Sequence, residues 1–257
     1  SSSKLIYVAL GVVFSSLVRM GFMFFDALQR PVKVIVQKRS DAKISYNMII
    51  FSIISNGILY INPALDKVVA SFLNPGSTAI LAYAEKIYLL PVSVFLTTFA
   101  IAMFPDLSQW IQSRKLDKFS HVFGRSVLGN LMFSVTTLVV FIILGEWLIS
   151  LLFGVAGISQ EHVHEIYIVF LGYAGAFLVA GTNAICTNIL FAFKKIRFIC
   201  GFSLFVVVMN LFFNLMVVFL FQQVLYISVA TSLVQVFSAF LLVFYIRQTL
   251  RKLNLLG

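Results

Sequence analysis

Long apolar runs alternate with short polar segments along the whole chain. Seven runs stand out: 5–28, 46–73, 78–104, 123–145, 163–192, 198–221 and 225–246. Each is long enough to cross a bilayer as a helix, which takes about 20 residues. The runs are too long for strands and lack an alternation of period two. The pattern predicts an all-α, polytopic transmembrane bundle of about seven helices.

Lysine and arginine gather in every second loop. They are Arg30, Lys33, Lys38, Arg39 and Lys43 after the first run; Arg114, Lys115, Lys118 and Arg125 after the third; Lys194, Lys195 and Arg197 after the fifth; and Arg247, Arg251 and Lys252 after the last. The intervening loops near 74–77, 146–165 and 222–223 contain none. Because basic loops stay inside, these loops and the C-terminus are predicted to be cytoplasmic.

This orientation places the N-terminus outside, with an odd number of helices. We therefore expect that earlier helices are missing and that the sequence is the C-terminal portion of a longer protein. The segment 105–125, with Pro105 and a capping Asp106 or Ser108, is predicted to be a short cytoplasmic interfacial helix or a plain amphipathic linker.

The composition supports an integral membrane protein. The chain is 61% hydrophobic and 11% charged, and its mean hydropathy is +1.02. The net charge of +10 follows from the basic loops, which favour contact with anionic membrane lipids, and it indicates no nucleic-acid partner. Cys186 and Cys200 lie in or beside apolar runs, so a disulfide framework is not expected.

Four charges lie within the predicted membrane helices around the 74–77 turn. A charge at mid-bilayer costs roughly 2.5–3.5 kcal/mol on insertion scales. Positions equidistant from the turn share a height, so Asp66 is level with Lys86 and Lys67 is level with Glu85. With a rise of about 1.5 Å per residue, this layer lies near mid-bilayer.

Two interpretations of this layer remain open. Two salt bridges could lock the helical hairpin, or the layer could line a hydrated cavity in which Lys86 faces an anionic substrate and Asp66 is free for a cation. Arg19, deep in the first run, either adds a second cation to the cavity or extends toward the cytoplasm. Pro91 is predicted to bend its helix.

A second polar set lies late in the chain. Asn210 and Asn214 are four residues apart, as are Ile227 and Thr231. With the carboxylate of Asp66, their amide, hydroxyl and backbone oxygens would suit Na⁺. Ordinary hydrogen bonding between helices is the alternative.

The other motifs of the sequence give weaker indications of function. The histidines of 161–165 are two residues apart and would face apart on a helix, so we expect no metal site in this external loop. The small residues of 172–184 predict close helix packing. No nucleotide-binding loop, catalytic triad or zinc motif is found, so the sequence offers no chemistry on a bond and no enzyme is expected.

The stretch 56–109 resembles the MurJ (MviN) lipid II flippases of the multidrug/oligosaccharidyl-lipid/polysaccharide exporter superfamily. The matching features are "ASFL…GS", "YAEKIYLLPVSVF" and "FPDLSQ". The resemblance implies fourteen helices in two lobes around a central cavity. Residues 1–30 would be the last helix of the N-terminal lobe, 31–45 a basic linker and 46–250 the six-helix C-terminal lobe.

The resemblance also implies site residues. Substrate binding falls on Lys86, which stands where the family has a cavity arginine, and on the adjacent Glu85, with Arg19 as a further cation. The sodium site of some members falls on Asp66, Asn210, Asn214, Ile227 and Thr231. Asn replaces an acid at one of these positions, so sodium binding is expected to be weaker.

The resemblance implies a flippase that moves a lipid-linked diphosphate glycan, lipid II of peptidoglycan synthesis, across the bacterial inner membrane by alternating access. No cofactor is expected apart from Na⁺ as coupling ion. The partners would be this substrate, the membrane lipids and the missing N-terminal lobe. The alternatives are another polysaccharide or drug exporter of the superfamily, or a membrane scaffold that transports nothing.

Overall fold

The computed structural model describes residues 17–18, 20–21, 61–113, 116–154 and 159–255. The chain divides into two units, Ser1–Ile44 and Ser45–Gly257, and all described residues from 61 onward belong to the second. Of the predicted helix over 5–28, only residues 17–18 and 20–21 are described, and all of 46–60 lies outside the described residues. The predicted domain boundaries stay predictions.

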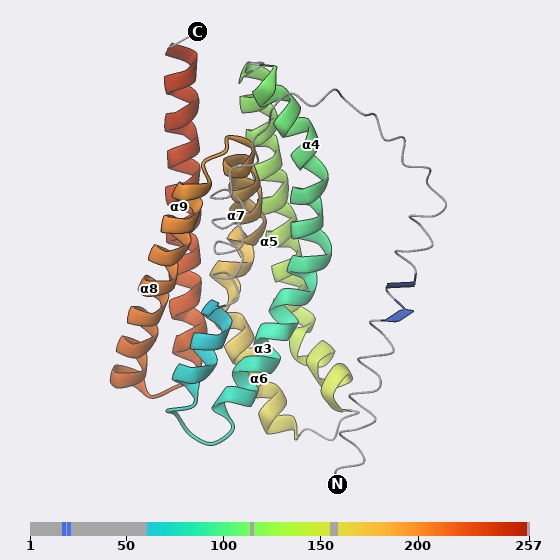
Figure 1. Cartoon of the computed structure of the whole chain (residues 1–257). Coiled ribbons are helices and arrows are strands. Elements are labelled where there is room, and N and C mark those ends of the chain that lie inside the picture. Colours follow the sequence, from blue (N-terminus) through green and yellow to red (C-terminus); the bar gives the residue numbers. More distant parts are fainter. Residues whose placement is uncertain (1–16, 19, 22–60, 114–115, 155–158, 256–257) are drawn as a thin grey trace. The chain divides into compact units, whose positions relative to one another are not determined.

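The second unit is built from helices, which confirms the all-α prediction (Figure 1). They are a helix described over 61–70, α3 (Ser77–Pro91), the π-helical η1 (Val92–Thr97), α4 (Thr98–Gln112), α5 (Leu116–Gly154), α6 (Gln160–Gly172), α7 (Ala174–Ala192), α8 (Ile196–Phe221) and α9 (Leu225–Leu255). Among the described residues, five stretches are long and apolar enough to cross a membrane: Ser77–Pro105, Phe119–Phe153, Ala174–Ala192, Ile196–Phe221 and Leu225–Arg251. The chain is therefore a multi-pass membrane protein.

The connections gather at two ends of the bundle. The α4–α5 and α7–α8 connections and the end of α9 lie at one end, which we call the basic end because Lys194, Lys195, Arg247 and Arg251 are there. The 71–76, α5–α6 and α8–α9 connections lie at the opposite end. This arrangement is the one that the alternation of basic loops requires.

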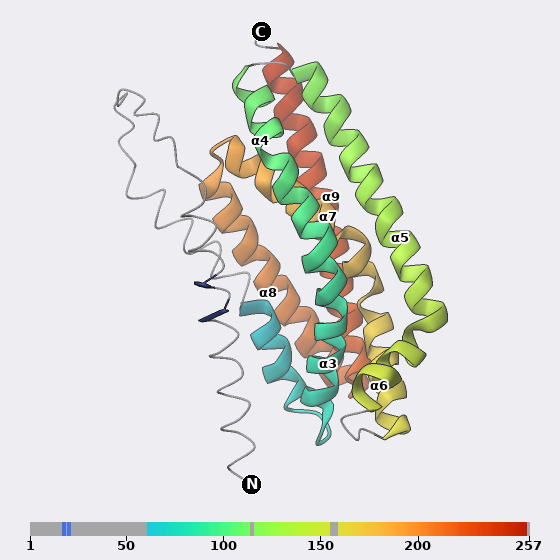
Figure 2. The same cartoon turned by 90° about the vertical axis from the view of Figure 1, so that its right-hand side faces the viewer.

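Helices α7 and α9 form the centre of the bundle. They pack on each other, α8 packs on α9, and α4 and α5 pack on α7; in Figure 2, α5 and α8 lie on opposite sides of this central pair. Many large apolar side chains of α5 and α8, such as Ile143 and Phe219, point outward. Such outward apolar faces are what hydrocarbon contact requires.

The turn before α3 depends on a glycine. Gly76 has φ 95°, a left-handed conformation that side chains with a Cβ rarely adopt. With Asn74 and Pro75 it reverses the chain within a few residues. The turn therefore places the 61–70 helix and α3 as neighbours, as the equal-height argument assumed.

Two sequence predictions are corrected. The segment 105–125 is not a separate interfacial helix, because α4 continues through Pro105 to Gln112 and α5 begins at Leu116. Its aromatic residues do not lie on a membrane surface: Phe119 is fully buried, and Trp110 packs against the same core cluster.

The run 163–192 is not one continuous helix, because α6 ends at Gly172 and α7 begins at Ala174. Ser232 of α9 fills this break. Its hydroxyl donates to the carbonyl of Gly172 at 2.6 Å and accepts from the amide of Ala176 at 3.1 Å. A helix can break inside a membrane when a neighbour satisfies the freed backbone groups in this way.

The helix is irregular just after Pro91, and the predicted bend itself stays a prediction. The following turn, η1, is π-helical, and the hydroxyl of Thr98 donates to the carbonyl of Ser93, five residues back, at 3.2 Å. Proline has no amide hydrogen and its ring crowds the turn before it, so helices are commonly irregular around a proline. Leu96 of η1 is buried in a cluster with Phe177 of α7, so the π-turn is packed and not frayed.

The predicted close packing of small residues is confirmed at Gly181. A Cβ added there would overlap the side chain of Asn130 on α5, which is itself only 4% exposed. The contact between α5 and α7 therefore requires glycine at this position.

Replacing Gly181 with alanine is expected to lower the free energy of unfolding by about 1–3 kcal/mol, the usual cost of overpacking. Gly201→Ala is the matched control, because a Cβ at Gly201 on α8 meets nothing within 4 Å. The measurement is the melting temperature of the full-length protein in detergent. Adding Asn130→Ala should restore much of the loss; equal melting temperatures for Gly181→Ala and wild type would show that the contact is loose.

Candidate functional site

Asp66 lies at the centre of a buried polar cluster formed by three helices. Its Oδ1 accepts hydrogen bonds from Nδ2 of Asn210 and Nδ2 of Asn214, each at 2.6 Å. Its Oδ2 accepts from the hydroxyl of Thr231 at 3.1 Å. Asp66 is 4% exposed, and the two asparagines are more deeply buried still. We call these four residues the Asp66 cluster.

The cluster has an excess of oxygen acceptors. Oδ1 of Asn210 and Oδ1 of Asn214 are buried without a hydrogen-bond donor among the described residues. Leaving two carbonyl oxygens unpaired is costly in a membrane interior. An asparagine amide can turn its oxygen or its nitrogen toward the same neighbour. The four side chains could thus present a carboxylate, two amide oxygens and a hydroxyl to one point, a donor set that fits a hard cation such as Na⁺.

Ile227 is the fifth residue of the predicted cation site. It is fully buried on α9, four residues before Thr231. A contribution from its backbone carbonyl stays a prediction.

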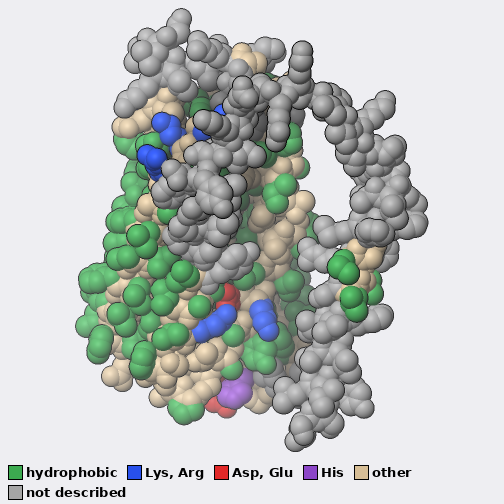
Figure 3. Space-filling view, viewed as in Figure 1, with side chains coloured by type: hydrophobic (Ala, Val, Ile, Leu, Met, Phe, Trp, Pro, Cys, Tyr) green, Lys and Arg blue, Asp and Glu red, His purple; other side chains and the backbone are tan. Residues whose placement is uncertain are grey.

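The four charges around the 74–77 turn separate onto two faces. Nζ of Lys67 pairs with Oε2 of Glu85 at 2.8 Å, and these side chains are 39% and 11% exposed. Lys86 is exposed, and its Nζ lies 5.8 Å from the centroid of the Tyr83 ring. Figure 3 shows basic and acidic side chains together on this open face, away from the basic end. We call Lys67, Glu85 and Lys86 the charged face.

This arrangement excludes the interpretation with two salt bridges, and the hydrated cavity with Lys86 facing a substrate stays a prediction. The salt bridge between Lys67 and Glu85 forms as the equal-height argument allowed, but one between Asp66 and Lys86 does not. Neighbouring helical residues point about 100° apart, so Lys67 turns toward α3 while Asp66 turns toward α8 and α9. Arg19 lies outside the described residues.

The coupling between Lys67 and Glu85 is testable by exchanging the charges. Lys67→Glu and Glu85→Lys should each lower the melting temperature of the full-length protein, because each places like charges together. The exchanged pair should recover most of the loss, with a coupling of about 0.5–1 kcal/mol for this partly exposed pair. Simple addition of the two single effects would mean that the residues do not interact.

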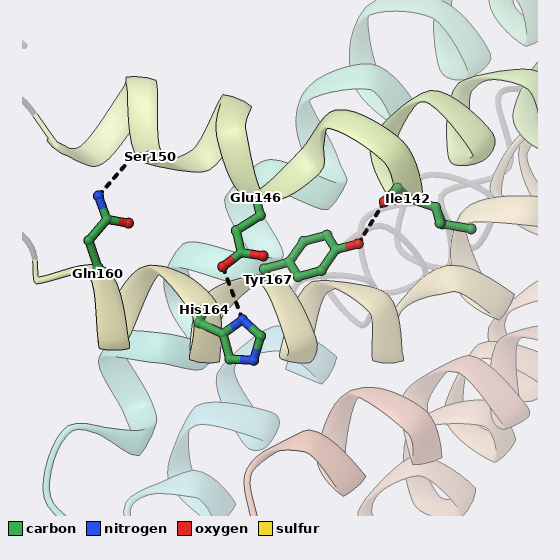
Figure 4. Close-up of polar contacts among 6 residues, drawn as sticks. All are labelled: Ile142, Glu146, Ser150, Gln160, His164 and Tyr167. Atoms are coloured by element: carbon green, nitrogen blue, oxygen red, sulfur yellow. Dashed lines mark hydrogen bonds and ion pairs between the residues drawn. The ribbon is translucent and has the colours of Figure 1, made fainter.

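The segment 161–165 is helical and not a loop, which corrects its predicted conformation. It lies in α6, where Nδ1 of His164 contacts Oε1 of Glu146 on α5 at 3.0 Å (Figure 4). The same pair of helices is joined by Gln160 to Ser150 and by Tyr167 to the carbonyl of Ile142. No group of three metal-binding side chains occurs among the described residues. These contacts fasten α6 to α5.

Sequence reasoning missed one feature of the charged face. The equal-height argument pairs Lys67 only with Glu85, yet more than a third of the Lys67 side chain is open. Lys67 and Lys86 flank Glu85 on the same side. The signal was present in the spacing, because residues 67 and 86 are also nearly equidistant from the turn.

Comparison with known proteins identifies the family. The family model described as "Lipid II flippase MurJ" matches residues 3–257. The chain belongs to the MurJ lipid II flippase family. A probable lipid II flippase MurJ of Helicobacter pylori is 29% identical over 99 residues, which cover 38% of this chain and 22% of that protein. One of Rickettsia prowazekii is 26% identical over 100 residues, covering 39% and 20%.

Solved structures confirm the fold. A lipid II flippase MurJ in an inward closed conformation aligns with a TM-score of 0.66 at 20% identity, covering 80% of this chain and 43% of that one. A MOP superfamily transporter from Pyrococcus furiosus aligns with a TM-score of 0.63 at 18% identity, covering 77% and 43%. The match spans less than half the length of these structures. At such identities the likeness shows the fold alone, so the roles of the MurJ site residues in this chain stay proposals.

Proposed function

We propose that the protein containing this chain is a flippase that carries lipid II, a lipid-linked diphosphate glycan, from the cytoplasmic to the outer leaflet. The observation that carries the proposal is the charged face. In it, Lys86 is open within the apolar span Ser77–Pro105, beside an ion pair whose lysine is also partly open. Intramembrane charges of this kind are costly and are retained mainly for function.

The charged face suits a diphosphate. Glu85 holds Lys67 in place, while Lys86 keeps its charge free of any carboxylate among the described residues. Two lysines can neutralise an anionic headgroup as point charges, although neither offers the bidentate geometry of arginine. The headgroup would cross along this face while the lipid tail stays in the bilayer.

The Asp66 cluster would bias the conformational cycle. Bound Na⁺ would supply positive charge to the carboxylate. The chain's own contribution is to bring together three helices whose polar atoms prefer one arrangement with the cation and another without it. A ligand shifts such an equilibrium only by its difference in affinity for the two states.

The fold by itself is also compatible with a drug exporter. A MATE transporter in its bent conformation aligns with a TM-score of 0.66 at 15% identity. An exporter of cationic drugs needs an acidic binding face, whereas Lys67 and Lys86 outnumber Glu85 here. The charged face therefore favours an anionic substrate. We further propose that the protein lies in the bacterial inner membrane with its C-terminus cytoplasmic and that a second lobe completes the cavity.

Depletion of the full-length protein in its own cells tests this function. A flippase predicts that lipid-linked glycan precursor accumulates on the cytoplasmic leaflet. A membrane scaffold predicts loss of an assembly without accumulation of precursor. Unchanged precursor levels after complete depletion would contradict the proposal.

A further inference from the structure

A cavity lined in part by polar side chains, which we call the polar cavity, lies about one helical turn from the Asp66 cluster. Its volume is about 80 Å³, and it lies among the 61–70 helix, α7, α8 and α9. Six polar side chains line it: Asn62, Asn183, Thr187, Ser203, Gln235 and Ser238. A water molecule needs about 10–15 Å³ of a cavity measured in this way, so several waters fit.

The cavity lies on the basic-end side of the Asp66 cluster. Asn62 precedes Asp66 by four residues, and Gln235 follows Thr231 by four. One helical turn, about 5.4 Å, therefore separates the levels on both helices. On both helices, going from the cluster to the cavity leads away from the turns at 74–76 and 222–224. These turns lie at the end opposite the basic end, so the cavity is on the basic-end side of the cluster.

The cavity has oxygen acceptors that the described residues leave unpaired. Oδ1 of Asn62 and Oδ1 of Asn183 are buried without a donor from the described part of the chain. The amide nitrogen of Asn183 is already used, because it donates to Oε1 of Gln235 at 2.9 Å and to its backbone carbonyl at 3.3 Å. Both asparagines line the cavity, and buried acceptors without a donor call for water or a cation.

A neighbouring cavity is lined mainly by apolar side chains, so polar lining is not common to all cavities of the described bundle. Between α8 and α9, the side chains of Phe205, Met209, Phe213 and Phe237 line an apolar cavity of about 260 Å³. The two cavities share Val206 and Ser238. Within the described bundle, the polar lining therefore belongs to the side that adjoins the Asp66 cluster.

We propose that the polar cavity is a hydrated passage by which a monovalent cation moves between the Asp66 cluster and the basic-end side of the membrane. This inference rests on the cation role proposed above for the cluster. The cavity's lining has no formal charge, so its oxygens hold a cation weakly enough to release it, whereas the carboxylate of Asp66 holds it more firmly.

Thiol labelling of the full-length protein tests the passage. Ser203→Cys and Met209→Cys are compared in a background in which Cys186 and Cys200 are replaced by alanine. Both positions are partly buried on α8, but Ser203 lines the polar cavity and Met209 the apolar one. The probe is a small cationic methanethiosulfonate added to vesicles in choline chloride or in sodium chloride. Because only the thiolate reacts, a thiol in hydrocarbon is protected.

We expect Ser203→Cys to react at least tenfold faster than Met209→Cys in choline and to be slowed severalfold by Na⁺. Equal, slow labelling at both positions would show a dry cavity and overturn the passage. Fast labelling of Ser203→Cys without any effect of Na⁺ would show water but no cation, which also overturns it. Failure of the flippase proposal is distinguishable, because labelling with Na⁺ protection in a protein that moves no lipid would keep the passage and reject only that function.

Discussion

Replacing Lys86 with alanine in the full-length protein is expected to slow the flipping of a lipid-linked diphosphate by about 10- to 100-fold. The reason is the loss of a charge-assisted contact to phosphate, which is worth about 1.5–3 kcal/mol. The side chain is open and pairs with no carboxylate among the described residues, so its removal leaves no buried acid unpaired. The measurement is the rate at which a labelled lipid-linked diphosphate appears on the opposite leaflet of proteoliposomes.

Two variants control for this result. Lys86→Arg keeps the charge and should retain most of the rate. Lys195→Ala removes an exposed lysine at the basic end, far along the bundle from the charged face, and should leave the rate unchanged. A normal rate for Lys86→Ala would remove Lys86 from the substrate path.

Replacing Asp66 with asparagine is expected to abolish the response of the protein to Na⁺. The substitution keeps size and shape but removes the only acid of the cluster. A bound cation stabilises the wild type by about 2.7 kcal/mol when its concentration is 100 times Kd, and the variant should show none of this gain. The measurement is the melting temperature of the full-length protein in sodium chloride and in choline chloride.

Asp66→Ala separates ion binding from packing. It also removes the three hydrogen bonds from Asn210, Asn214 and Thr231, at about 0.6 kcal/mol each on the average for membrane helices. This variant should be less stable than Asp66→Asn by about 2 kcal/mol, with or without Na⁺. A wild type that does not respond to Na⁺, or an Asp66→Asn variant that responds like it, would contradict the cation site.

Most of the fold could be predicted from the alternation of apolar runs and polar segments along the chain. Long apolar runs predict membrane helices, because no other element keeps so many backbone groups bonded within one segment. The break at Tyr173 was not predictable, since the partner that satisfies the freed backbone, Ser232, lies some sixty residues away. The same limit applies to Phe119, whose burial depends on core partners brought together only by the fold.

The candidate site was partly predictable for a similar reason. The level of a residue along a helical hairpin follows from the number of residues between it and the turn. Lys67 and Glu85 could therefore be paired from the sequence. The orientation of each side chain depends on which helix packs beside it, and counting could not show that Asp66 faces α8 and α9 while Lys86 stays open. The cavity beside Asn62 and Gln235 involves helices distant in the sequence, and only their packing reveals it.

The central claim is that Lys86 binds phosphate at mid-membrane, and lipid binding tests it most directly. Native mass spectrometry of the full-length protein would compare a polyprenyl diphosphate with the corresponding polyprenyl alcohol, which has the same tail and no charge. The account predicts that wild type and Lys195→Ala prefer the diphosphate by about tenfold or more, as one charge-assisted contact allows, and that Lys86→Ala loses this preference. A Lys86→Ala protein that still prefers the diphosphate as strongly as wild type would contradict it.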